Sequence, residues 1–212
     1  VAQTGKGLEN TAAATAMGIT RYHPVAIINQ GTSGGHDPAL QVGDIVLGKR
    51  ALNAGNFKTP FREKGEGSAP LSWKPMDLLA SSGSAGEGES AKKSERIRYY
   101  VGDSKLLASA HAVSGQYKRG KVTEGTIASA NFWNNELDRI AWLHENFGTS
   151  TEEMETVAAA QIAHAYDVPF LGVRVLSNNL TNGGHYDPST AKDCQQFVRD
   201  LVTHYIASLE AK

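Results

Sequence analysis

The chain has 212 residues and a mass of 22.6 kDa, and 40% of its residues are hydrophobic, which is enough for one substantial α/β core. Its 21 basic and 22 acidic residues are spread along the chain, so no basic face is available to recruit nucleic acid or an anionic membrane. No apolar run approaches the roughly 18 residues that are needed to span a bilayer. We therefore expect a small neutral molecule as the partner, and neither nucleic acid nor a membrane.

The sequence shows no motif with the spacing of a metal site. The seven histidines show no HExxH or other paired spacing, so we predict no metal and no cofactor. Cys194 lies on the apolar face of a predicted helix, which favours a small buried residue over a nucleophile. One cysteine cannot form an internal disulfide. The compartment stays open between a favoured cytoplasmic location and an extracytoplasmic one.

The first third of the chain predicts a helix, a buried strand and a glycine-rich loop. Residues 1–4 are expected to end a strand before a glycine turn, and residues 10–19 form an alanine-rich helix. The apolar run PVAIIN, residues 24–29, suits a strand that is buried on both faces. The loop NQGTSGG, residues 29–35, follows where open α/β sheets bind ligands, although a plain tight turn is the alternative. The segment VGDIVLG, residues 42–48, comes next.

Residues from about 54 to 98 form a predicted excursion from the domain. Glycine, serine, proline and charge replace the regular pattern there, and residues 81–94 are expected to be the least structured part. Four apolar side chains of its first half could lie against another surface: Phe57, Phe61, Trp73 and Met76. The excursion is either a lid or subunit contact, or a segment that simply packs on the domain.

The middle of the chain predicts a capped helix over residues 103–112 and a strand over residues 120–126. The segment SANFWNN, residues 129–135, then stands before an amphipathic helix that ends at Phe147. Its two aromatic residues, Phe132 and Trp133, are either core residues or part of a binding site.

Residues 149–179 combine an acidic pair, a helix and a buried strand. Glu153 and Glu155 flank Met154 at the predicted helix start, and a strand over residues 170–176 leads to a polar end. Carboxylates at this position also complement the helix dipole, which is the alternative to a catalytic role. A last amphipathic helix begins near Asp187 and Pro188 and packs on the core.

These motifs together resemble the purine nucleoside phosphorylase and uridine phosphorylase superfamily, and among its members the methylthioadenosine/S-adenosylhomocysteine nucleosidases. The resemblance rests on the MEME-like acidic helix start, the RxxSD-like strand end RVLSN and the pair NQGTSGG and VGDIV. It implies a three-layer α/β fold in which helices flank a mixed sheet, with residues 1–212 as a single domain. It also implies that the family's first strands, and with them its general acid and base, lie upstream of Val1.

The resemblance assigns a role to ten residues of this sequence. Glu155 would accept hydrogen bonds from the ribose diol and stabilise positive charge on the sugar. Asn178 stands where adenine-specific relatives use an aspartate, and Arg174 and Ser177 would orient the water and the base-binding loop. Phe132 would stack on the purine, and the backbone of Trp133 would bind the edge of the base. The remaining residues would contact the sugar or border the pocket for the nucleophile: Glu153, Met154, Thr32 and Gly34.

The reaction implied is hydrolysis of the N-ribosidic bond of a purine nucleoside, either methylthioadenosine- or adenosylhomocysteine-like or 6-oxopurine. Phosphorolysis is one alternative, but Asn29 stands where the hexameric phosphorylases carry a phosphate-binding arginine. A catalytically impaired storage or binding protein of the same fold is the other. Asn178 in place of aspartate predicts relatively better activity on 6-oxopurine substrates than adenine-specific relatives have, with adenine nucleosides still possible. Relatives of nucleosidase type imply a homodimer.

Overall fold

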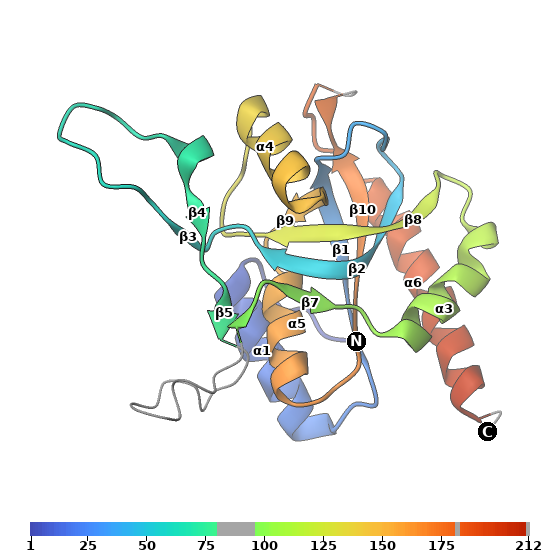
Figure 1. The fold of residues 1–212 in the computed structure, drawn as a ribbon. Coiled ribbons are helices and arrows are strands. Elements are labelled where there is room, and N and C mark those ends of the chain that lie inside the picture. The colour runs from blue at the N-terminus through green and yellow to red at the C-terminus, as the bar shows by residue number, and fades with distance from the viewer. Residues whose placement is uncertain (80–95, 181–182, 211–212) are drawn as a thin grey trace.

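The computed structural model describes residues 1–79, 96–180 and 183–210, and its centre is a six-stranded mixed sheet (Figure 1). The strand order is β10-β1-β9-β8-β2-β7, and β10 pairs with β2 as well as with β1. Five of the strands therefore close into a ring, which leaves β7 outside it. The bounds of the six strands are Ile27–Gly35 for β1, Ile45–Asn53 for β2, Tyr99–Val101 for β7, Val122–Ser129 for β8, Thr149–Glu153 for β9 and Phe170–Asn178 for β10.

Helices cover the sheet on several sides, as Figure 1 shows. Helices α1 (Leu8–Tyr22) and α5 (Thr156–Ala165) pack together below the ring, and α3 (Ser104–Val113) and α6 (Thr190–Glu210) pack on another side. Helix α4 (Leu137–Phe147) lies above β9, and single 3₁₀ turns occur at η1 (Pro70–Ser72) and η3 (Ser114–Gln116). The predicted α/β class, with a mixed sheet flanked by helices, is confirmed. That residues 1–212 form one domain stays a prediction.

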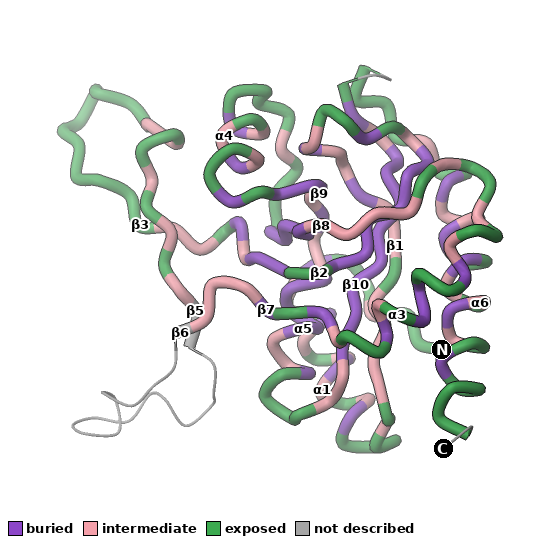
Figure 2. The backbone as a smooth tube through the Cα atoms, turned by 45° about the vertical axis from the view of Figure 1, so that its right-hand side comes forward, coloured by how far each residue is buried: buried purple, intermediate pink, exposed green. Residues whose placement is uncertain are grey.

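Buried residues concentrate in the strands and on the inner faces of the helices (Figure 2). One cluster joins strand β10 to α3 and α6, with Val173, Leu106 and Leu201 completely buried. A separate cluster fills the ring itself, where Val46, Ile127 and Leu176 meet from three different strands. Close-packed interiors leave no space for added atoms. The ring is therefore a packed core that fixes the ends of its strands.

Several sequence predictions of boundaries were wrong. Residues 1–4 pair with no strand among the described residues, because an extended segment becomes a strand only where a neighbour supplies the ladder. The glycine-rich segment 29–35 is not a loop, since it continues β1 and pairs with β10 as far as Asn178. Glu153 does not start a helix. It ends strand β9, which pairs with β8, and helix α5 begins at Thr156.

Residues 57–76, in the first half of the predicted excursion, form a narrow arm. Strands β3 (Phe57–Lys58) and β4 (Lys74–Pro75) pair at its base, and β5 (Leu78–Leu79) pairs with β6 (Arg96–Ile97) beyond it. Figure 1 shows the arm projecting from the body beside α4. Whether it is a lid or a subunit contact stays a prediction, and its part over residues 81–94 lies outside the described residues.

The buried side chain of Arg139 fastens the arm to α4. Its guanidinium carbon lies 4.6 Å from the ring centre of Phe57 and 4.5 Å from that of Trp142, and Nη1 donates a hydrogen bond to the Pro70 carbonyl at 2.8 Å. The ring centre of Trp73 lies 5.4 Å from the same guanidinium carbon, so three aromatic rings surround it. Desolvation lowers the pKa of Arg139, but aromatic faces partly replace the lost water. Within the described residues, no helix is long and apolar enough to cross a membrane.

Candidate active site

A cavity of about 840 Å³ lies where the carboxyl ends of four strands meet. Strands β1 and β10 are parallel, as are β8 and β9. Strands β1 and β9 are antiparallel but pair only through their last residues, Gly34 with Glu152 and Gly35 with Thr151. Both carboxyl ends therefore arrive at the same point. Nine of the ten predicted site residues line this cavity: Thr32, Gly34, Phe132, Trp133, Glu153, Met154, Glu155, Ser177 and Asn178.

Glu153 lies in the inner wall of the cavity, and both of its carboxylate oxygens accept hydrogen bonds from the protein. It accepts hydrogen bonds from the Ser129 hydroxyl, from the backbone N–H groups of Glu155 and Thr156, and from the guanidinium of Arg174. Burial by itself raises the pKa of Glu153, but the charge of Arg174 and these hydrogen bonds outweigh it and lower the pKa. Because its oxygens are occupied, Glu153 holds the start of α5 in place. The capping role considered for the acidic pair belongs to this residue.

Glu155 is open to the cavity. It stands at the N-cap position of α5, but its side chain makes no capping hydrogen bond. Instead Oε1 accepts a hydrogen bond from the Gly7 N–H at 2.9 Å, and Oε2 lies 3.7 Å from Nη2 of Arg174. Burial is the main cause that raises its pKa, and the neighbouring charge of Glu153 adds to it. A partly exposed carboxylate with spare acceptor capacity can bind the hydroxyl groups of a ligand.

Arg174 lies behind the cavity wall and does not line it. Its side chain is 1% exposed, and Nε and Nη2 lie 3.0 Å and 2.5 Å from Oε2 of Glu153. Nη2 also donates to Oδ1 of Asn29 at 2.5 Å. Gly31 makes room for it, since a Cβ atom there would stand 3.0 Å from Nη1. The guanidinium of Arg174 contacts Glu153 and lies near Glu155, and both of these residues line the cavity. The predicted role of Arg174 in orienting the water stays a prediction.

Ser177 and Asn178 fix the far side of the cavity. The buried Ser177 hydroxyl lies 3.1 Å from the Ser33 carbonyl oxygen and 2.9 Å from Oδ1 of Asn178. A Cβ atom on Gly34 would stand 3.2 Å from Nδ2 of Asn178, so the amide nitrogen lies over this glycine. The Asn178 side chain therefore presents N–H donors to the cavity.

Phe132 and Trp133 form the mouth of the cavity and are 57% and 58% exposed. The preceding Asn131 ties their loop to the start of α1, because its Oδ1 accepts from the Leu8 N–H at 2.9 Å and its Nδ2 donates to Glu9 at 2.6 Å. Exposed aromatic rings on an anchored loop suit the binding of a flat apolar ligand face.

Sequence reasoning missed several lining residues. His36 and Glu152 meet in the wall, and Lys6, Leu180 and Tyr186 lie around the cavity. The alternation of side chains along a strand gives Glu152 the opposite face from Glu153, but this signal needs β9 to be recognised as a strand.

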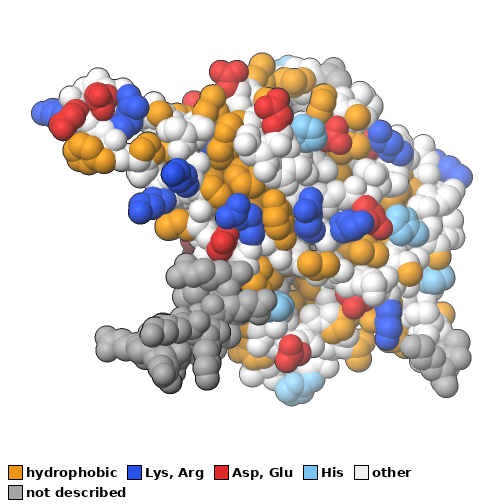
Figure 3. Space-filling view, in the orientation of Figure 1, with side chains coloured by type: hydrophobic (Ala, Val, Ile, Leu, Met, Phe, Trp, Pro, Cys, Tyr) orange, Lys and Arg blue, Asp and Glu red, His pale blue; other side chains and the backbone are white. Residues whose placement is uncertain are grey.

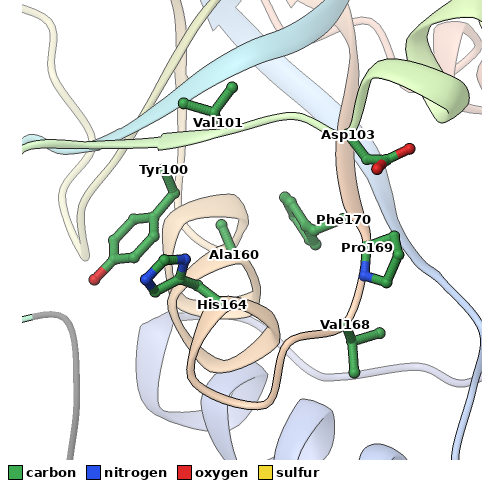
Figure 4. A pocket seen from close by; sticks show the side chains of 8 residues that line it. All are labelled: Tyr100, Val101, Asp103, Ala160, His164, Val168, Pro169 and Phe170. Atoms are coloured by element: carbon green, nitrogen blue, oxygen red, sulfur yellow. The ribbon is translucent and has the colours of Figure 1, made fainter.

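A second cavity, of about 150 Å³, lies on the other side of the sheet beside β7 and α5 (Figure 4). The Tyr100 and His164 rings meet edge to face at 5.5 Å, but the Asp103 carboxylate points away and caps α3. Its polar groups do not converge on a common point. Among the described residues, no group of three His, Cys, Asp or Glu side chains could hold a metal ion.

The family described as the phosphorylase superfamily matches residues 1–209. The chain therefore belongs to that superfamily, and the family resemblance inferred from its motifs is confirmed.

Among curated relatives, the 5'-methylthioadenosine/S-adenosylhomocysteine nucleosidase of Shewanella pealeana is 29% identical over 188 residues, which are 88% of this chain and 71% of that protein. The nucleosidase of the same name from Anoxybacillus flavithermus is 27% identical over 83% of this chain and 66% of its own length. Two solved structures share the fold. The Colwellia psychrerythraea nucleosidase in complex with adenine has a TM-score of 0.70 at 23% identity over 96% of this chain and 76% of its own. The futalosine hydrolase of Helicobacter pylori has a TM-score of 0.69 at 17% identity, over 94% and 77%.

Proposed function

We propose that the protein is a purine nucleosidase, which hydrolyses the N-ribosidic bond of a purine nucleoside to the free base and the ribose moiety. The observation that carries the proposal is the position of Glu155. Its partly exposed carboxylate stands in an 840 Å³ cavity that Phe132 and Asn178 also line. The names of the curated relatives and the adenine in the Colwellia complex support a purine nucleoside as the ligand.

The cavity supplies several of the groups that cleavage of this bond uses. As the bond between C1' and the purine nitrogen breaks, its electrons leave with the base and positive charge develops on the ribose. Glu155 would accept hydrogen bonds from the ribose hydroxyls and stabilise that charge, while Met154 packs against the sugar. Water would add to C1' near Thr32 and Gly34, and its displaced proton balances the charge of the departing base. Asn178 would donate to N7 or to a 6-oxo oxygen, and the Phe132 ring would stack on the base.

Hydrolysis is favoured over phosphorolysis by the electrostatics around Thr32 and Gly34. Arg174 is committed to Glu153 and Asn29, and His36 is bonded to Glu152. Among the described residues no arginine lines the cavity, and the lysine that does, Lys6, precedes α1 and does not belong to the strand that carries Thr32 and Gly34. An incoming phosphate dianion would therefore find no bidentate, charge-assisted arginine contact there.

A panel assay tests the proposal. Release of ribose or its derivatives should be measured from methylthioadenosine, adenosine and inosine, with and without phosphate. Product formation that is independent of phosphate supports the nucleosidase. Strict dependence on phosphate would indicate a phosphorylase, and binding without turnover would indicate a storage or binding protein.

We also propose that the protein is a homodimer in which the arm contributes to the contact. Three of its apolar side chains are exposed, Phe61 at 86%, Met76 at 48% and Leu71 at 46%, and hydrophobic atoms gather on and beside the arm in Figure 3. Light scattering on the intact protein tests this, with Phe61→Asp expected to shift the mass toward the monomer. A parent protein that is monomeric at micromolar concentration would contradict it.

A further inference from the structure

Gly34 has a polar residue beside it on each neighbouring strand. It is in register with Glu152 of β9 on one side and with Asn178 of β10 on the other. Residues in register across a sheet place their side chains on the same face. The amide nitrogen of Asn178 lies over the missing Cβ of Gly34, and both Glu152 and Asn178 line the cavity. A carboxylate and an amide therefore face each other across a glycine floor, with Cα atoms roughly 10 Å apart at two strand spacings.

His36 fixes the Glu152 side chain. Its Nε2 lies 2.9 Å from Oε2 of Glu152, and its Nδ1 lies 2.8 Å from the Thr149 hydroxyl oxygen. An ionised carboxylate only accepts, so Nε2 carries the hydrogen and donates it, while the hydroxyl can donate to Nδ1. The buried Arg139 guanidinium interacts favourably with the charge on Glu152. One oxygen of Glu152 is thus bound, and the orientation of the carboxylate is set.

The other oxygen is not used by the protein. In the part of the chain that the structure describes, Oε1 of Glu152 accepts no hydrogen bond, and the side chain is only 9% exposed. Glu153, the next residue, differs because donors from Ser129, Arg174 and the start of α5 occupy both of its oxygens. Oε1 of Glu152 is not among the buried polar atoms that lack a partner in the described residues, so it is open to the cavity, where water or a ligand can donate to it. This oxygen is therefore available to an N–H group of a ligand in the cavity.

We propose that Glu152, held by His36, reads the purine by accepting a hydrogen bond from a ring N–H, while Asn178 donates to the opposite part of the same edge. This inference rests on the proposed function and names its substrate class, nucleosides of 6-oxopurines. A 6-oxopurine carries a hydrogen on N1 and acceptors at O6 and N7, which match an acceptor at Glu152 and a donor at Asn178. In a 6-aminopurine N1 is a lone pair, which would face the carboxylate and leave Oε1 of Glu152 without a donor, while Asn178 could donate only to N7.

Binding of free bases tests the inference without requiring turnover. Calorimetry on the intact protein should show hypoxanthine bound at least tenfold more tightly than 1-methylhypoxanthine, which lacks the N1 hydrogen, and more tightly than adenine. Equal affinities for hypoxanthine and 1-methylhypoxanthine, within a factor of two, would overturn the proposal. This comparison uses the parent protein and does not depend on any variant folding.

The variant Glu152→Gln gives a sharper result. The His36 N–H must be accepted by the amide oxygen, which turns the amide NH₂ toward the cavity, where it can donate to N1 of adenine. The hypoxanthine-to-adenine affinity ratio should fall at least tenfold, whereas Glu145→Gln, an exposed carboxylate on α4, should leave it unchanged. A Glu152→Gln variant that melts like the parent and keeps its ratio would overturn the proposal.

His36 acts by positioning Glu152. A pair of variants can distinguish this role from general support of the fold. His36→Leu should weaken hypoxanthine binding and leave adenine binding nearly unchanged, and His36→Gln, which can still donate to Glu152, should restore most of the loss. Equal losses for both bases would mean that His36 only supports the fold.

Nucleoside assays run alongside distinguish the two proposals. Cleavage of inosine and 1-methylinosine at equal efficiency would leave the nucleosidase intact and refute the base-reading role. Selective binding of hypoxanthine without cleavage of any nucleoside would support the role of Glu152 and refute the enzyme. Failure to bind any of the three bases would refute both.

Discussion

The inside of the strand ring and the cavity outside it use the same kinds of residue for opposite purposes. Inside, Arg174 and Glu153 are almost fully buried and bonded to each other, and Ser129 and the start of α5 supply further donors. Outside, Glu155, Glu152 and Asn178 each keep acceptors or donors that no described residue of the protein uses. The difference teaches that saturation of hydrogen bonds, more than residue type, separates structural polar groups from ligand-binding ones.

The largest effect on stability is expected from breaking the buried ion pair between Arg174 and Glu153. Glu153→Gln leaves the buried Arg174 charge without its counter-ion, which should lower the free energy of unfolding by about 3 to 5 kcal/mol. Urea unfolding measures this, with Glu145→Gln on the exposed face of α4 as a control expected to change it by less than about 0.5 kcal/mol. A loss below about 1 kcal/mol would show that the pair is not a structural unit.

The same residue predicts how stability depends on pH. The pKa of Glu153 is lower in the folded protein than in the unfolded chain, so its contribution is complete above the unfolded value of about 4.3. That contribution is lost as the pH falls through the lower, folded pKa. The acid side of the stability curve should therefore be flatter in Glu153→Gln than in the parent.

The next largest effect is expected on turnover, from a change at Glu155 in the cavity wall. Glu155→Gln should lower turnover about a hundredfold, roughly 3 kcal/mol, because its charge acts mainly on the transition state. Since the pKa of Glu155 is raised, the acid limb of the kcat/KM profile should lie above the usual range of a carboxyl group, and it should disappear in the variant. Near-normal turnover would mean that Glu155 only anchors the Gly7 turn.

A smaller effect is expected for Asn178→Asp, which exchanges the amide donors for a carboxylate. The preference should shift toward adenosine or methylthioadenosine by about 1 to 3 kcal/mol, the cost of mispairing one buried polar group. Competition between inosine and adenosine in one reaction measures the shift directly. Equal effects on both substrates would mean that Asn178 does not read position 6.

The smallest effect is expected at the exposed mouth. Phe132→Ala should raise the Michaelis constant about tenfold with little change in turnover, because stacking on a base contributes roughly 1 to 3 kcal/mol. Phe61→Ala, an equally exposed ring on the arm, is the matched control for purine affinity. An unchanged affinity of Phe132→Ala for the purine would mean that the Phe132 ring does not stack on the base.

Sequence motifs were sufficient for the class of fold and for part of the cavity wall. The apolar run before Asn29 and the run from Phe170 each predicted a strand, and in the structure the two strands pair in parallel. Nine of the ten proposed site residues line the cavity where the carboxyl ends of these strands meet those of β8 and β9. This worked because the carboxyl ends of neighbouring parallel strands always lie together. The assigned roles stay predictions until the variants are measured.

The sequence by itself determined the buried strands, the amphipathic helices and the family, since these depend on periodicity and on motifs that are local in the chain. Only the tertiary structure decided which acidic residue does what. Pairing with β8 makes residues 149–153 a strand, and its alternation turns Glu153 into the ring and Glu152 toward His36. Glu153 and Asn29 hold Arg174 behind the cavity wall, and Glu155 lines the cavity. The deciding contacts join different elements: Ser129 and Arg174 lie 24 and 21 positions from Glu153, and His36 lies 116 positions from Glu152. Local patterns do not contain these contacts, which separate the structural carboxylate from those that remain available to a ligand.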